Sequence, residues 1–152
     1  MNITRGLAIL VLFLGGVAVV LGVVFVAQGA AKDNLLVTAM QQEQITLGIS
    51  TEEITQGDVI DTAKEAEVAG DTVREHRHGI APTYGNLLGG KQYDPTDITQ
   101  LKYAQALNLE NYLYLAVLGF GLTQVVIGSG AFMIITGLAL VATGIVLNRR
   151  LD

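Results

Sequence analysis

The sequence contains no cysteine and no tryptophan, and it has only two prolines and two histidines among its 152 residues. The absence of cysteine excludes disulfide bonds, thiolate metal sites, iron–sulfur clusters and thiol nucleophiles. Charged residues are scarce, at 15% of the chain, where a soluble domain has about 25%. Because 51% of the residues are hydrophobic and the mean hydropathy is +0.48, the composition predicts a membrane protein.

Basic charge is also in short supply. The chain has 9 Lys and Arg against 14 Asp and Glu, which gives a net charge of −5 and a pI near 4.9. Nucleic-acid binding requires a concentrated basic surface that neutralises phosphates. We therefore expect no nucleic-acid partner.

Residues 7–27 carry no charge and are long enough to cross a bilayer. At about 1.5 Å per residue they make a helix of roughly 31 Å, which matches a hydrocarbon core of about 30 Å. The alternative is a cleaved signal peptide, with Arg5 as its basic start and Ala27-Gln28-Gly29 as a small-residue cleavage site. The apolar core of a signal peptide is usually about 7 to 15 residues long, so we favour a retained membrane anchor.

Residues 113–148 form a second charge-free segment, which is too long for a simple span. As one helix, residues 113–147 would measure about 52 Å. Either a single helix projects beyond the membrane, or Gly128-Ser129-Gly130 is a turn between two short spans of 15 and 17 residues. We favour the single helix, because both halves would be short for a span.

The segment between the two anchors is predicted to be mainly helical. Residues 32–44 can continue the first helix, and residues 58–78 repeat apolar residues at helical spacing, with Gly79 in the position of a C-cap glycine. Residues 79–95 contain both prolines and several glycines, which indicates an irregular loop before a helix that starts near Asp97. Glu110 should lie at the membrane boundary, where it can stay hydrated.

These elements predict an all-α fold with two transmembrane helices and a mainly helical extracytoplasmic segment between them. The expected parts are an N-terminal transmembrane helix (residues 1–29), the extracytoplasmic segment (30–111), a long C-terminal transmembrane helix (112–148) and a cytoplasmic tail (149–152).

Charge near the ends of the anchors indicates the topology. Arg5, Arg149 and Arg150 flank the outer ends, whereas Lys32 and Lys102 lie on the middle side, a count of three against two. By the positive-inside rule this favours a multi-pass protein of the cell membrane with both termini in the cytoplasm. Tyrosines are enriched at membrane interfaces, so we assign Tyr112 and Tyr114 as membrane-interface residues.

Small residues recur at intervals of seven in both anchors. The series are Ala8, Gly15, Gly22 and Gly29 in the first anchor, and Ala116, Thr123, Gly130, Gly137 and Gly144 in the second. Each series lies on one helix face, where missing side chains let another helix approach closely. We interpret both faces as helix-packing surfaces, either between the chain's own anchors or with neighbouring copies.

Neither candidate metal site is convincing. His76 and His78 are two residues apart, so on a helix they face different directions, and the flanking arginines repel a cation. Asp58, Asp61 and Glu65 form an acidic strip that is typical of an ordinary hydrated face. We predict no catalytic residues, no cofactor and no metal.

The second half of the chain resembles a loosely defined group of uncharacterised small two-pass bacterial membrane proteins. The resemblance lies in the Gly-Gly-Lys-x-Tyr element of residues 89–93 and in the glycine-rich C-terminal helix. Members of that group sometimes carry the label of an aromatic-ring-opening dioxygenase, which nothing in these residues supports. The resemblance implies a two-pass topology and no functional residues.

These observations predict a non-enzymatic structural subunit that assembles through its small-residue helix faces. Its partners would be membrane lipids and either other copies of itself or the subunits of a larger membrane complex. The alternatives are an accessory subunit of a respiratory or photosynthetic complex and a homo-oligomeric pore.

Overall fold

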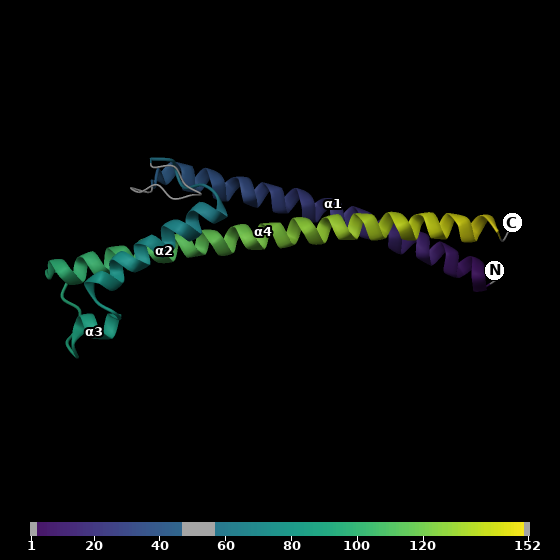
Figure 1. Ribbon diagram of the computed structural model, residues 1–152. Helices are drawn as coiled ribbons and strands as arrows, with labels where there is room; N and C mark the ends of the chain where they lie inside the picture. The colour runs from purple at the N-terminus through teal and green to yellow at the C-terminus, as the bar shows by residue number, and fades with distance from the viewer. Residues whose placement is uncertain (1–2, 47–56, 151–152) are drawn as a thin grey trace. The chain divides into compact units, whose positions relative to one another are not determined.

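The structure is a computed structural model that describes residues 3–46 and 57–150. The described residues form four helices, α1 (Ile3–Glu43), α2 (Ala63–Ile80), α3 (Tyr84–Leu88) and α4 (Ile98–Arg149) (Figure 1). Their only extended pairing is one antiparallel bridge between Thr46 and Val59. The all-α prediction is confirmed, and α1 and α4 are both long and apolar enough to cross a membrane.

Helix α1 is a single element of 41 residues. It runs from the first charge-free segment through residues 32–43, which confirms that these residues continue the helix. The helix ends where Gln44 adopts a positive φ of 50°. A left-handed residue at this position is a common way to terminate a helix.

Helix α4 spans 52 residues without a break. It continues through Gly128-Ser129-Gly130, so the alternative of a turn between two short spans is wrong. Its start agrees with the sequence prediction, because an Asp97 carboxylate oxygen accepts the backbone N–H groups of Thr99 and Gln100 at 2.8 and 3.2 Å. This is the N-cap arrangement that satisfies the first donors of a helix.

Helix α2 begins five residues later than predicted, at Ala63 in place of Asp58. A capping box fixes this start: the Thr62 hydroxyl accepts the N–H of Glu65, whose carboxylate accepts the N–H of Thr62. Upstream, the backbone N–H of Ile60 donates a hydrogen bond of 2.9 Å to the carbonyl oxygen of Ile45, in an extended pairing. The preceding residues are therefore held outside the helix.

The predicted end of α2 is also wrong. Gly79 lies inside the last turn, and the C-cap is Ala81, which has an extended backbone. Proline disfavours helical geometry in the residue before it, so Pro82 sets the end. The predicted irregular loop contains α3, which the Thr83 side chain caps and which ends at Gly89 in the left-handed conformation.

The chain divides into two compact units. Unit 1 comprises residues 1–34 and 122–152, and unit 2 comprises residues 35–121. Each long helix therefore contributes to both units. The predicted segment boundaries at 29/30, 111/112 and 148/149 all fall inside α1 or α4, which continue through them.

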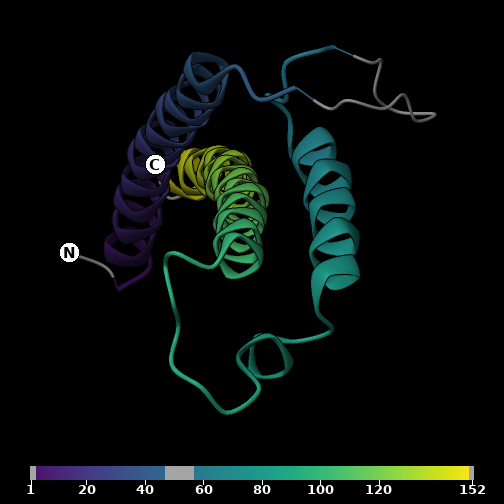
Figure 2. The ribbon, with the colours of Figure 1, turned by 90° about the vertical axis from the view of Figure 1, so that its left-hand side faces the viewer.

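The apolar core lies in unit 2, where α2 packs beside the first part of α4 (Figure 2). It consists of Met40, Ile60, Ala66, Ala69, Leu113, Ala116 and Phe120. The start of the long apolar segment of α4 is thus part of the core of unit 2. Only the residues of this segment from 122 onward belong to unit 1.

Candidate functional site

The buried residues of unit 1 are all small. Among its described residues the buried positions are Ala8, Gly15, Gly22, Gly29, Thr123, Gly130, Gly137 and Gly144. These are eight of the nine positions in the two seven-residue series, and the ninth, Ala116, is buried in unit 2. The structure therefore brings the two series together on one contact surface.

The two series run antiparallel and meet at the backbone. A Cβ atom added to Gly22 would lie 2.6 Å from the carbonyl oxygen of Gly130, and one added to Gly130 would lie 2.7 Å from the carbonyl oxygen of Gly22. The pair Gly15 and Gly137 repeats this arrangement at 2.8 and 2.7 Å. Such contacts place Cα–H groups against carbonyl oxygens, which occurs only where side chains are absent.

Flanking positions extend the same contact. A Cβ atom on Gly144 would lie 2.6 Å from Cγ of Leu12, and one on Gly29 would lie 2.6 Å from Cγ1 of Ile127. Both series thus face each other within one chain. Of the two alternatives that the sequence left open, the structure shows contact between the chain's own helices.

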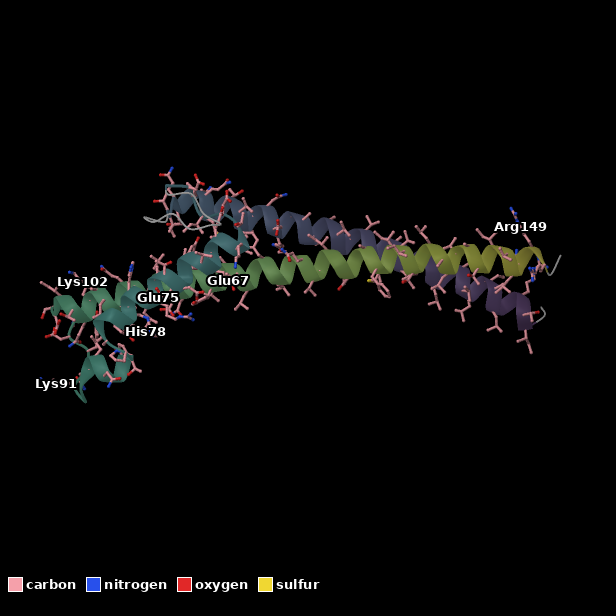
Figure 3. All side chains as sticks on the ribbon, viewed as in Figure 1. Glu67, Glu75, His78, Lys91, Lys102 and Arg149 are labelled. Carbon is pink, nitrogen blue, oxygen red and sulfur yellow. The ribbon has the colours of Figure 1, made fainter. Side chains whose placement is uncertain are left out.

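Many of the large apolar side chains of unit 1 are exposed. Phe13 and Leu122 are each 66% exposed, and Phe132 and Ile135 are each 69% exposed. Figure 3 shows carbon-rich side chains projecting from both helices of this unit, with charge at its end near Arg149. Soluble proteins bury their large apolar residues, so unit 1 has the reverse arrangement.

A polar contact joins the two helices at the other end of unit 1. The hydroxyl of Thr123 is buried and donates to the Asp33 carboxylate at 2.7 Å. The sequence reading included Thr123 only as a small packing residue. It missed the hydrogen bond because Asp33 lies 90 positions away in the sequence.

Unit 2 holds a buried ion pair between α2 and α4. Arg77 and Glu110 are 8% and 7% exposed, and the guanidinium donates from Nε to one carboxylate oxygen at 2.6 Å and from Nη2 to the other at 3.3 Å. Arg77 also donates from Nη1 to the hydroxyl of Tyr103, which is buried. The expectation that Glu110 stays hydrated is therefore wrong.

Electrostatics keep the Arg77 guanidinium charged. The hydrogen bond with Glu110 raises the pKa of Arg77 above its usual value, against the opposing effect of burial. The Tyr103 ring lies 5.0 Å from the guanidinium carbon, and the Tyr84 ring of α3 lies 6.1 Å from the Tyr103 ring. The cluster of Arg77, Glu110 and Tyr103 thus fixes the position of α2 along α4 within unit 2.

Tyr114 makes a second contact between α2 and α4. Its hydroxyl donates to the Asp71 carboxylate at 2.5 Å, and its ring lies 5.7 Å from the guanidinium carbon of Arg74. Burial, and then the hydrogen bond with Asp71, raise the pKa of Tyr114 to about 12. Tyr112 is partly buried against the core of unit 2. Their assignment to a membrane interface stays a prediction.

The residues weighed as metal ligands have other surroundings. His76 is exposed, and Nε2 of His78 lies 3.2 Å from Nη2 of Arg77. Asp61 accepts a hydrogen bond from Gln41 at 2.6 Å, and Glu65 belongs to the capping box of α2. Within residues 3–46 and 57–150, no group of three or more His, Asp or Glu side chains is placed to hold a metal ion.

No known protein family, curated protein or solved structure matches the chain. The resemblance to small two-pass bacterial membrane proteins therefore stays a prediction. In its Gly-Gly-Lys-x-Tyr element, Gly89 and Gly90 have φ values of 55° and 79°, and Tyr93 is 37% exposed. The two glycines are thus required by the turn that leads from α3 towards α4.

Proposed function

We propose that the chain is a non-enzymatic structural subunit of the cell membrane. Unit 1 is its lipid-embedded hairpin of two helices, and unit 2 is a helical module outside the lipid. The small-residue faces hold the two spans of one chain together. Other surfaces of the chain contact its partners, which are further copies of the chain or the subunits of a larger membrane complex.

The observation that carries this proposal is the reversed burial pattern of unit 1. The buried positions of its described residues are glycine, alanine and threonine, whereas Phe13, Phe132 and Ile135 are largely exposed. In water this would leave a large apolar surface exposed, which soluble monomers avoid. In lipid the drive to bury large apolar side chains vanishes, and close backbone packing through small residues holds helices together.

Charge placement supports a definite span and topology. In unit 1 the apolar helices are bounded at one end by Arg5, Arg149 and Arg150, and at the other by Lys32 and Asp33. The excess of basic residues at the end that carries the termini favours its placement in the cytoplasm. Unit 2 then lies on the extracytoplasmic side.

The structural role follows from how the polar groups are used. Arg77 donates hydrogen bonds to Glu110 and to Tyr103, and the hydroxyl of Thr123 donates to Asp33. These are contacts between helices of the same chain, the usual role of buried polar side chains. They support a scaffold held in one arrangement.

Alkaline extraction of native membranes tests the membrane assignment. The full chain should stay in the membrane pellet after carbonate washing and should enter solution only with detergent. The mass of the detergent-extracted particle then tests the subunit role. A particle several times the 16.1 kDa of one chain supports it, and a single chain without partners contradicts it.

Single cysteines test the topology, because the natural chain has none and each label is unique. Lys91→Cys and Lys102→Cys should react with a membrane-impermeant maleimide in intact cells. Arg150→Cys should react only after the membrane is opened. The reverse labelling pattern would contradict the proposed orientation.

A further inference from the structure

A groove of about 230 Å³ runs between α1 and α4 in unit 1, where the charge-free part of α1 ends. Its lining combines apolar and polar side chains from both helices. The lining residues are Gln28, Gly29, Lys32, Leu122, Thr123 and Val126.

The inner part of the groove suits a hydrocarbon chain. Gly29 forms the floor of the groove, where it packs against Ile127 of α4. Leu122 and Val126 lie one helical turn apart on α4 and form an apolar wall. Leu122 is 66% exposed, which leaves this wall accessible from the surrounding lipid.

The mouth of the groove carries a positive charge. Lys32 and Gln28 are exposed and lie one turn apart on α1. Within the described part of the chain, no carboxylate forms an ion pair with Lys32. The neighbouring Asp33 carboxylate accepts the hydroxyl of the lining residue Thr123 at 2.7 Å, so one of its oxygens is engaged beside the groove. The ammonium and the amide thus remain available as donors to an anion.

We propose that this groove binds one anionic phospholipid, with an acyl chain against Leu122 and Val126 and the phosphate paired with Lys32. The inference rests on the proposed membrane location of unit 1. A long lysine side chain at the end of a span reaches the headgroup level, where it attracts negatively charged lipid. The apolar wall also holds the acyl chain, so the lipid binds at this groove and is not merely attracted to the lysine.

Lipid retention by the full chain in mild detergent tests the site. Purified protein is incubated with equal amounts of phosphatidylglycerol and phosphatidylcholine that have the same acyl chains, and bound lipid is counted by native mass spectrometry. Wild type should retain phosphatidylglycerol with a preference of about fivefold, the effect of one basic residue near a lipid phosphate. Equal retention of the two lipids would overturn the proposal.

Two variants separate the headgroup contact from the acyl contact. Lys32→Gln should lose the preference between the lipids, whereas Lys91→Gln, which removes an exposed lysine of unit 2, should keep it. Val126→Phe fills the groove and should lower the retention of both lipids. The matched control Val146→Phe, in a groove without a basic residue, should not. A preference that survives Lys32→Gln would overturn the site, provided that circular dichroism shows the same helix content.

The outcome is separate from that of the membrane assignment. A chain that stays in carbonate-washed membranes but retains both lipids equally contradicts the lipid site and leaves the membrane assignment standing. A chain that carbonate releases from the membrane contradicts both.

Discussion

Gly22 has no side chain at a point where the backbones of α1 and α4 are in contact within unit 1. A methyl group there would lie 2.6 Å from the carbonyl oxygen of Gly130 and 2.9 Å from the amide nitrogen of Ile134, both backbone atoms that cannot rotate away. Gly16, in the same helix, has no atom within 4 Å of the same methyl position. The two glycines therefore lie in the same helix, but only Gly22 packs against another helix.

We predict that Gly22→Ala destabilises the helix pair by about 1–3 kcal/mol, the usual cost of overpacking. Gly16→Ala should be neutral or stabilising by about 0.5–1 kcal/mol, because alanine favours helix more than glycine does. Thermal unfolding of both variants in detergent, followed by circular dichroism, measures the difference. Equal stabilities of the two variants would contradict the contact.

Glu110 compensates the charge of a buried guanidinium. We predict that Glu110→Leu destabilises unit 2 by about 3–5 kcal/mol, because it leaves Arg77 charged and unpaired in the interior. The double variant with Arg77→Met should recover much of this loss, since a buried ion pair can be replaced by apolar groups of similar size. Denaturant unfolding of the full chain measures both effects.

An exposed ion pair provides the control. Lys64 and Glu67 lie 3.3 Å apart, with side chains 56% and 50% exposed, so Glu67→Ala should change stability by less than about 1 kcal/mol. If Glu110→Leu were no more harmful than Glu67→Ala, the pair would contribute nothing to the position of α2.

Tyr114 should make unit 2 sensitive to alkaline pH. Its folded pKa of about 12 exceeds the unfolded value of 10, so the unfolded chain loses this proton first. The stabilisation is complete below pH 10 and is lost as the pH rises to about 12. An ultraviolet titration should show a tyrosinate component near pH 12 that Tyr114→Phe removes, and its persistence in that variant would contradict the assignment.

At the scale of the helices, the seven-residue spacing of small residues is what places one continuous contact face on α4. A single alanine inserted between Ile134 and Ile135 should rotate Gly137 and Gly144 by about 100° away from that face. We predict that this insertion disrupts the helix pair more than Gly22→Ala does. An alanine inserted between Gln92 and Tyr93, outside the helices and after the Gly89-Gly90 turn, should be tolerated. Thermal unfolding compares the two insertions.

The sequence was sufficient to predict features that depend on local spacing. Intervals of seven identified the small residues that the structure buries in unit 1, and the short halves on either side of Gly128-Ser129-Gly130 favoured one long helix. The start of α2 was also readable, because Thr62 and Glu65 have the spacing of a capping box. The spacing of apolar residues alone extends the predicted helix back to Asp58, which is five residues too early.

Contacts between distant residues could not be predicted in this way. Arg77 and Glu110 are 33 positions apart, and nothing near either residue indicates the other. The division of α4 between the core of unit 2 and unit 1 was likewise hidden, because residues 113–148 carry no charge in either part. Only the packing of Leu113 and Phe120 against α2 and α1 in unit 2 distinguishes them.

At the scale of the molecule, α1 and α4 contribute to both units, but the two units bury opposite kinds of residue. Unit 2 buries Met40, Ile60 and Leu113 in an ordinary apolar core. Among its described residues, unit 1 fully buries only small residues and leaves many of its large apolar side chains exposed. A single chain thus combines packing suited to water with packing suited to lipid.

The most direct test of this account measures whether lipid or water contacts the outer face of α4. Spin labels on single cysteines at Leu122, Phe132 and Ile135 of the reconstituted chain report collision with oxygen, which concentrates in lipid, and with a water-soluble nickel reagent. We predict high oxygen collision and little nickel collision at these three positions, and the reverse at Lys102 in unit 2. Nickel access at Phe132 equal to that at Lys102 would contradict the claim that unit 1 lies in lipid.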